Sequence, residues 1–202
     1  MSAGEIGDSD EALAARAAAG DAAAFETLVK RYQSRVYRLA CRLTDNESDG
    51  ADVLQDTFLQ AYRHVSSFRG DARFGTWLYR IATNAALMHR RSRARRPAES
   101  LDEYLPGFDD AGRHRRAPDE LIVASRAEEL IDRRTLAAEA RRALDRLPET
   151  HRAAFVLRDL EDLSTAEVAE VLDIEPAAVR QRVHRARLQL RGYLNALAGE
   201  RA

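Results

Sequence analysis

Apolar residues recur at every third or fourth position through most of this chain, and no stretch alternates apolar and polar residues with period two. The first spacing marks one face of an α-helix, whereas a half-buried strand needs the second. We therefore expect an all-α fold. The longest apolar stripe follows Asp21, which is suited to cap a helix, and its members are Phe25, Leu28, Val29, Tyr32, Val36, Leu39, Ala40 and Leu43.

Two further helices are expected in the first half of the chain. After the turn-rich segment TDNESDG, a second helix should point Val53, Leu54, Phe58, Ala61, Tyr62 and Val65 inward. Its outer face would then carry Asp52, Gln55 and Asp56. A third helix should begin near Thr76 and run into a cluster of arginines. Residues 1–96 are therefore predicted to form an N-terminal helical domain.

The helical spacing fails between Pro97 and Pro118, where prolines, glycines and opposed blocks of charge replace it. It resumes before Pro148 and continues toward the C-terminus. These changes predict a linker over residues 97–132 and a second helical domain over residues 133–202. The expected architecture is two small helical domains joined by a flexible linker.

The charges are balanced overall but unevenly distributed. With 32 Lys and Arg against 33 Asp and Glu, the net charge is −1, which argues against a protein that coats nucleic acid by bulk attraction. Lys30 is the sole lysine, and two clusters hold many of the arginines: Arg90, Arg91, Arg93, Arg95 and Arg96, and then Arg180, Arg182, Arg185, Arg187 and Arg191. Solvated helix faces would explain such clusters, but arginine suits bidentate contacts with phosphates and base edges, which favours nucleic-acid binding.

The most specific local pattern is the segment STAEVAEVLDIEPAAVRQRVHRARLQL. Ser164 and Glu167 match a capping box, so a short helix should run from Thr165 to Leu172. Asp173 tolerates the left-handed turn, and Pro176 suits the first position of the next helix. The pattern predicts a helix-turn-helix whose second helix points Arg180, Gln181, His184, Arg185 and Arg187 outward to read DNA. The alternative is an ordinary helical hairpin with a charged exterior.

Other classes of protein are disfavoured. Cys41 is the only cysteine, so neither an internal disulfide nor a thiolate zinc cluster is expected. The five histidines are dispersed, and neither an HExxH pattern nor a glycine-rich phosphate loop is present, so we expect no catalytic residue, metal site or cofactor. No apolar run approaches the length of a membrane span and the first residues do not read as a signal peptide, so we expect a cytoplasmic protein without membrane insertion.

Four blocks of the chain resemble the extracytoplasmic-function sigma factors of bacterial RNA polymerase, in the order typical of that family. They are DAAAFETLVKRYQSRVYRLACRL, ADVLQDTFLQAYRHVSSFRG, FGTWLYRIATNAALMHRRSRARR and ALDRLPETHRAAFVLRDLEDLSTAEVAEVLDIEPAAVRQRVHRARLQL. The resemblance covers nearly the whole length. It implies a promoter-melting domain and a helix-turn-helix domain on either side of a linker, and a protein that directs polymerase to promoters.

The resemblance also implies a role for each surface. The face of Asp52, Gln55 and Asp56 would bind the β′ clamp helices of core RNA polymerase, and the chain would also meet the β flap. The candidates for binding and opening the −10 element are Phe68, Arg69, Phe74, Arg80, Asn84, Arg90 and Arg91, with Trp77 structural. The candidates for the −35 element are Arg180, Gln181, Arg182, His184, Arg185 and Arg187. An anti-sigma factor is the further expected partner.

Some positions depart from the family pattern. Ala177, Ala178 and Gln181 replace a common Gly-Thr pair and a small polar residue, and Ala51 and Met88 replace acids. The promoter sequence is therefore not carried over from the family. A helix-turn-helix regulator that binds DNA without polymerase is the alternative function, but a receiver-type regulator would show alternating strands and helices in its first half.

Overall fold

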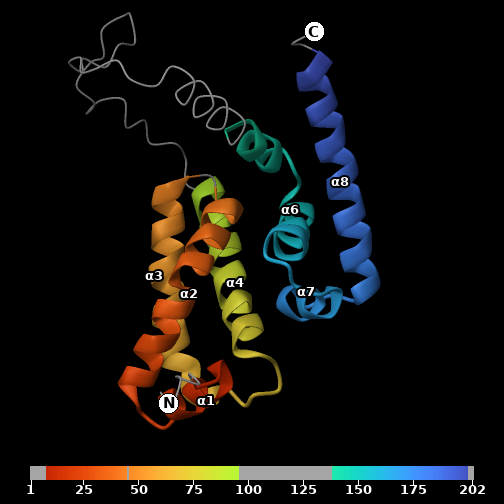
Figure 1. Cartoon of the computed structure of the whole chain (residues 1–202). Helices are drawn as coiled ribbons and strands as arrows, with labels where there is room; N and C mark the ends of the chain where they lie inside the picture. The colour runs from red at the N-terminus through yellow and green to blue at the C-terminus, as the bar shows by residue number, and fades with distance from the viewer. Residues whose placement is uncertain (1–7, 45, 96–137, 200–202) are drawn as a thin grey trace, which may run out of the picture.

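A computed structural model describes residues 8–44, 46–95 and 138–199, and these residues form helices and turns without a strand. The N-terminal part comprises α1 (Asp10–Ala18), α2 (Ala22–Leu43), α3 (Glu47–His64), the short 3₁₀ helix η1 (Val65–Ser67) and α4 (Phe74–Arg95). Helices α2, α3 and α4 pack together along their lengths, and α1 closes one end of the bundle (Figure 1). The all-α prediction is confirmed.

Local capping sets where these helices begin. The Asp21 carboxylate accepts hydrogen bonds from the Ala23 and Ala24 amides, and Asn46 accepts one from the Asp49 amide at 2.7 Å. The predicted stripe of α2 lies in the core except for the half-buried Val29. One inward assignment is wrong: the Tyr62 side chain is 57% exposed, because its ring only edges against Phe25 at the rim of the bundle, 5.1 Å between centroids.

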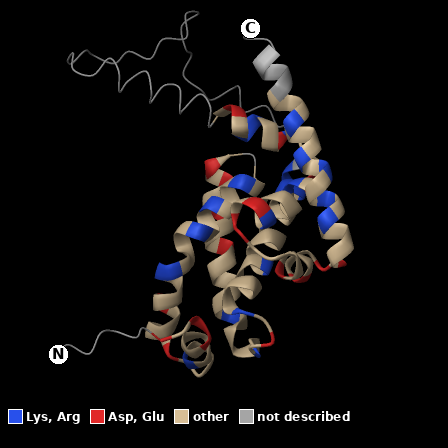
Figure 2. Ribbon diagram, turned by 45° about the vertical axis from the view of Figure 1, so that its right-hand side comes forward, with Lys and Arg blue, Asp and Glu red and all other residues tan. Residues whose placement is uncertain are grey.

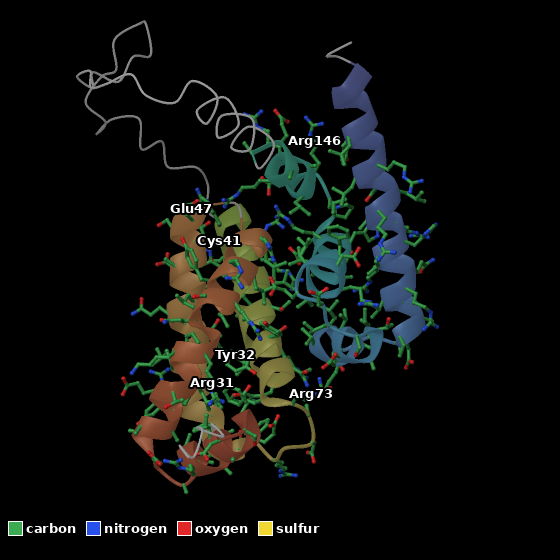
Figure 3. The ribbon with its side chains drawn as sticks, in the orientation of Figure 1. Arg31, Tyr32, Cys41, Glu47, Arg73 and Arg146 are labelled. Carbon is green, nitrogen blue, oxygen red and sulfur yellow. The ribbon has the colours of Figure 1, made fainter. Side chains whose placement is uncertain are left out.

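A close approach of α2 and α3 requires Gly50. A Cβ atom at this position would lie 2.5 Å from the Cys41 sulfur and 3.2 Å from the Cys41 backbone nitrogen. Cys41, labelled in Figure 3, is therefore in tight contact with the neighbouring helix although its side chain is only half-buried. Any larger residue at position 50 would push the two helices apart.

The C-terminal part contains a helical segment at 138–145, then α6 (Glu149–Phe155), the π-helical turn η3 (Val156–Leu160), α7 (Thr165–Leu172) and α8 (Pro176–Gly199). The predicted capping box is present, since the Glu167 amide donates to Ser164 Oγ and the Ser164 amide donates to Glu167 Oε2. Asp173 adopts the left-handed conformation at φ 52°, and Pro176 begins α8. The short helix, the turn and the long helix are therefore as predicted.

The two parts lie against each other. Helix α4 packs on α7, and α2 contacts η3. The buried apolar side chains of both parts form one continuous cluster. The predicted boundaries at 97 and 133 fall within residues 96–137, outside the described residues.

Candidate nucleic-acid interface

Helix α8 turns one face into the helix-turn-helix and the other to solvent. Val179, Val183 and Ala186 are buried against α6 and α7, which fixes the rotation of the helix about its axis. With that rotation, the side chains left exposed near its start are those of Arg180, Gln181, His184 and Arg185. A positively charged helix face with an amide and an imidazole, held on a rigid scaffold, is suited to the major groove of DNA. Arginine residues recur along this helix, where Figure 2 colours the ribbon blue.

Two predicted residues of this helix are partly engaged inside the protein. Arg187 donates two hydrogen bonds of 2.7 Å to the carboxylate of Asp159, from Nε and Nη2. Arg182 is half-buried. The structure therefore divides the six predicted residues into four that are exposed without an ion pair within the described chain and two that also contribute to packing.

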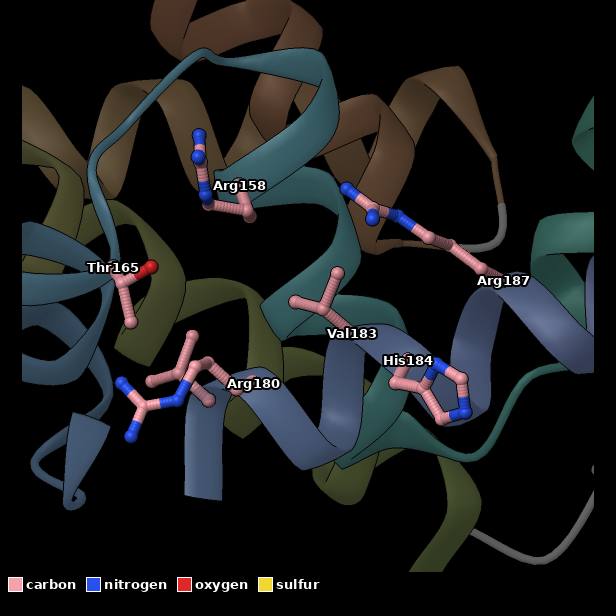
Figure 4. Close-up of a pocket in the computed structure, with 7 residues that line it drawn as sticks. Arg158, Thr165, Arg180, Val183, His184 and Arg187 are labelled. Carbon is pink, nitrogen blue, oxygen red and sulfur yellow. The ribbon is translucent and has the colours of Figure 1, made fainter. Parts of the chain in front are cut away.

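A cavity of about 230 Å³ opens beside the start of α8 (Figure 4). Its lining residues are Arg158, Thr165, Val179, Arg180, Val183, His184 and Arg187. Arg158 comes from η3, where Nη1 donates to the Leu163 carbonyl at 3.0 Å, so this arginine is positioned beside the start of α8. Sequence reasoning missed Arg158, because it lies outside the arginine clusters and no local pattern marks the π-helical turn.

Aromatic rings join the loop before α4 to the core. Phe74 stacks edge-on against Tyr32 at 5.5 Å, and Phe68 lies 5.7 Å from Phe74 and 5.4 Å from Trp77. Phe74 is 1% exposed, so its ring belongs to the core and does not face solvent, while its predicted contact with the −10 element stays a prediction. The structure begins α4 at Phe74 rather than near Thr76, which turns this ring inward. Phe68 is half-buried at the edge of the cluster.

The remaining −10 candidates lie on or beside α4. Arg69, Arg80, Asn84 and Arg91 are exposed, and Arg90 is half-buried. Because residues four and eleven apart share a helix face, Arg80, Asn84 and Arg91 line one side of α4. Arg91 donates to Glu149 of α6 at 2.7 Å, which places this face at the edge of the contact with the C-terminal part.

The acidic face of α3 is exposed as predicted at Asp52, Gln55 and Asp56. The Asp52 carboxylate lies 4.0 Å from His89 Nε2. Within the described part of the chain, Asp49, Asp52 and His89 bring possible metal ligands within 4.8 Å of one another. Asp49 is already bound by Arg93 at 2.6 Å and by Asn46, so its carboxylate is committed to side-chain contacts.

Comparison with known families matches both halves of this arrangement. The sigma-70 region 2 model matches residues 28–96, and the sigma-70 region 4 model matches residues 137–190. The ECF RNA polymerase sigma-E factor of Haemophilus influenzae is 36% identical over 197 residues, which cover 93% of this chain and 96% of that protein. The chain belongs to the extracytoplasmic-function sigma factors. RNA polymerase sigma-H factor of Pseudomonas aeruginosa is 35% identical over 185 residues, covering 89% of this sigma factor and 91% of that one.

A solved structure has the same fold. The structure described as CnrH in complex with the cytosolic domain of CnrY aligns with a TM-score of 0.66 and 29% identity, over 94% of this sigma factor and 99% of that chain. The region 2 match contains the acidic face of α3 and the candidates on α4, and the region 4 match contains the helix-turn-helix. This sigma factor therefore acts in promoter-specific transcription initiation and is not an enzyme. None of its described helices combines the length and the apolar character needed to cross a membrane.

Proposed function

We propose that this sigma factor divides promoter binding between a domain of residues 1–96, which grips polymerase and opens the −10 element, and a domain of residues 133–202, which reads the −35 element, with 97–132 as the linker. The observation that carries the proposal is the placement of Arg180, Gln181 and His184. They stand exposed on the first turns of a helix whose opposite face is buried. A rigid helix with this composition is built for duplex recognition.

Base reading is assigned to Arg180 and Gln181, because guanidinium and amide groups can form paired hydrogen bonds with base edges in the major groove. Arg158 and Arg185 lie beside them and would hold backbone phosphates, which position the helix without reading sequence. Arg182 and Arg187 would serve DNA less directly, since the first is half-buried and the second is bound to Asp159.

Strand opening is assigned to the face of α4. Asn84 offers an amide that can bond the Watson–Crick edge of an unpaired base, and Arg80 is exposed one turn before it. Phe68 can stack on a base only at the edge of its aromatic cluster, while Arg69, Arg90 and Arg91 would follow phosphates. Phe74 supports this surface from inside the core.

Polymerase binding is assigned to Asp52, Gln55 and Asp56. Two carboxylates and an amide on one exposed helix face suit a basic groove, such as one formed by the β′ clamp helices. A contact of the C-terminal domain with the β flap completes the proposed assembly with core polymerase. This sigma factor would act in the cytoplasm, where RNA polymerase works.

An anti-sigma factor is the further proposed partner. The relative CnrH was solved in complex with the cytosolic domain of CnrY. A second neighbour, the sigma factor RpoE from Bartonella quintana, was solved with the anti-sigma factor NepR, and at 20% identity it supports the common fold alone. The proposal therefore rests on the 29% identity with CnrH along 94% of this chain.

Transcription in vitro with core polymerase and genomic DNA, followed by mapping of start sites, tests the proposed function. Defined start sites that require the added sigma factor are expected. The Asp52→Lys, Asp56→Lys variant should lose them, whereas the exposed control Glu170→Lys on α7 should retain them. If the free chain shifted promoter duplex as strongly as polymerase with the sigma factor does, the protein would be a regulator that binds DNA unaided.

A further inference from the structure

Three arginines of the N-terminal domain face three glutamates of the C-terminal domain. Arg42 on α2 lies 2.5 Å from Glu161, Arg91 on α4 lies 2.7 Å from Glu149, and the weaker pair of Arg73 with Glu167 measures 3.6 Å. Arg73 is labelled in Figure 3, in the loop that precedes α4. These three pairs are basic on the first domain and acidic on the second, whereas a fourth pair, Arg141 of the C-terminal part with Glu47 of α3 at 3.7 Å, has the opposite sense. Ion pairs therefore join the two domains, and three of these four have their arginine on the N-terminal domain.

The pair of Arg42 and Glu161 is the most enclosed of the three. The Glu161 side chain is 5% exposed, and Arg42 donates both to its carboxylate and to the neighbouring Leu160 carbonyl. Burial raises the pKa of Glu161 above its ordinary value, although Arg42, Arg38 and Arg35 act in the opposite direction. A buried carboxylate of this kind opposes the contact unless a cation compensates it. Arg42 supplies the nearest compensating charge.

The contact also engages the proposed −10 surface. Arg91 is a candidate for binding single-stranded DNA. It donates two hydrogen bonds to the Glu149 carboxylate, from Nε at 3.1 Å and from Nη2 at 2.7 Å. Beside the contact lies a polar cavity of about 340 Å³, lined from both domains by residues that include Tyr79, Thr76, Glu161 and Glu167. We call this contact the seam: it combines the ion pairs and the polar cavity with part of the continuous apolar cluster. Its polar part makes the seam easier to separate than a dry, close-packed core.

The packing of α4 on α7 is incompatible with simultaneous binding of the −10 and −35 elements by this protein. Elements named for positions −10 and −35 are centred about 25 base pairs apart, which is about 85 Å along B-form DNA. In the structure, α4 packs on α7 and α7 packs on α8, so two interhelical contacts of about 8–10 Å each separate the two proposed reading helices. The segment 96–137 has enough residues to span more than about 100 Å if extended, at about 3.3 Å per residue.

We infer that the free sigma factor holds a closed form in which Glu149 masks Arg91, and that Arg42 permits this form by compensating the carboxylate of Glu161 in the seam. The masking of Arg91 rests on the proposed function, whereas the role of Arg42 does not. The closed form must open before both promoter elements are bound. An anionic partner that draws Arg42 away would leave Glu161 buried without its counterion and would favour opening.

Energy transfer between dyes on the two domains measures closure directly. Cysteines introduced by Gln60→Cys on α3 and Leu188→Cys on α8, in a Cys41→Ser background, place both dyes at exposed positions. The unmodified seam should give high transfer. Arg42→Gln should shift the equilibrium toward the open form by about tenfold or more, because it leaves the buried Glu161 carboxylate without its counterion. Adding Glu161→Gln should restore closure, and Glu161→Gln alone should stay closed.

Arg63→Gln is the matched control, since this exposed arginine of α3 lies outside the seam. Low transfer in the unmodified protein, or equal transfer for Arg42→Gln and Arg63→Gln, would overturn the closed form held by Arg42. Failure of Glu161→Gln to restore closure in the Arg42→Gln variant would overturn the compensating role of Arg42. Circular dichroism and thermal unfolding of each variant separate opening of the seam from unfolding of a domain.

Binding to single-stranded −10 DNA from a mapped promoter tests the masking of Arg91. Glu149→Gln should increase the affinity of the free chain severalfold, while the exposed control Glu170→Gln should not. If the Glu149→Gln variant is open but binds single-stranded −10 DNA no more tightly, the masking of Arg91 by Glu149 is overturned. The conclusion on closure from the dye measurement would not be affected. Transcription by the same variants, measured with core polymerase, judges the proposed function separately.

Discussion

Arg187 of α8 binds the carboxylate of Asp159 in η3 through two hydrogen bonds of 2.7 Å. This pair connects α8, the proposed DNA-reading helix, with the π-helical turn before α7 and helps to hold the orientation of α8. Arg185, two residues earlier, is exposed and has no ion pair within the described chain. Neighbouring arginines of one cluster therefore have different structural environments.

Replacing Arg187 should therefore affect stability more than replacing Arg185. Because Arg187 is 58% exposed, its loss in Arg187→Ala should lower the free energy of unfolding by about 1 kcal/mol or less. Arg185→Ala should leave stability unchanged but weaken binding to all duplexes to a similar extent, as expected for a phosphate contact. Urea denaturation and DNA binding by the polymerase complex measure the two effects, and equal stability of the two variants would contradict the assignment.

Substitutions in α8 should impair promoter recognition, whereas a substitution in α4 should impair promoter melting. Arg180→Ala or Gln181→Ala should remove base-edge contacts of about 1–3 kcal/mol and relax preference at individual upstream base pairs. Asn84→Ala should spare recruitment to duplex DNA and impair strand opening. A template with a pre-melted bubble should restore more transcription to Asn84→Ala than to Arg180→Ala, because unstacking has already occurred. Equal rescue would refute this division of roles.

Charge reversal of the α3 face should weaken binding to core polymerase without unfolding the protein. Exposed helix positions such as Asp52 and Asp56 usually change stability by about 0.5 kcal/mol or less. Pull-down with core polymerase should therefore show a loss of binding for Asp52→Lys, Asp56→Lys with a normal circular dichroism spectrum. Retained binding would mean that the acidic face is merely solvated.

Mild acid should strengthen the closed form. Glu161 faces Arg35, Arg38 and Arg42 from α2 and Tyr79 from α4, and burial raises its pKa above the ordinary value of 4.5. The closed form therefore binds a proton at a pH where the open form does not, so closure gains stability as the pH falls through the raised pKa toward 4.5. Energy transfer in Arg42→Gln should recover as the pH is lowered over this range. The Arg42→Gln, Glu161→Gln variant should show no such recovery.

Phe74 should behave as a core residue. Phe74→Ala removes a ring that is 1% exposed and contacts Tyr32, Phe68 and Trp77, so it should lower the free energy of unfolding by about 3–5 kcal/mol. The exposed control Arg69→Ala should change it by about 0.5 kcal/mol or less. Chemical denaturation measures both. A stable Phe74→Ala variant with a melting defect would return Phe74 to the DNA surface.

The helix-turn-helix could be predicted in detail because its signals are local. The capping box spans four residues, and the turn depends on the conformational preferences of Asp173 and Pro176 themselves. The domain contact had no such signal, since Arg42 and Glu161 are 119 residues apart and each alone resembles a solvated surface charge. The burial of Phe74 was not predicted because it depends on where α4 begins, and helix boundaries are the least certain part of a periodic pattern. The site roles of the exposed residues stay predictions.

Because α8 starts at Pro176, the number of residues after Pro176 determines the direction in which each later side chain of α8 points. Each residue added to an α-helix turns all later side chains by about 100° about the axis. One alanine inserted after Ala178 would leave the composition almost unchanged, yet it would move Val179 and Val183 out of the core and rotate Arg180 and His184 away from their present direction. This helix should therefore tolerate an exchange of Ala177 or Ala178 far better than a single insertion, because insertion changes the direction in which every later side chain points.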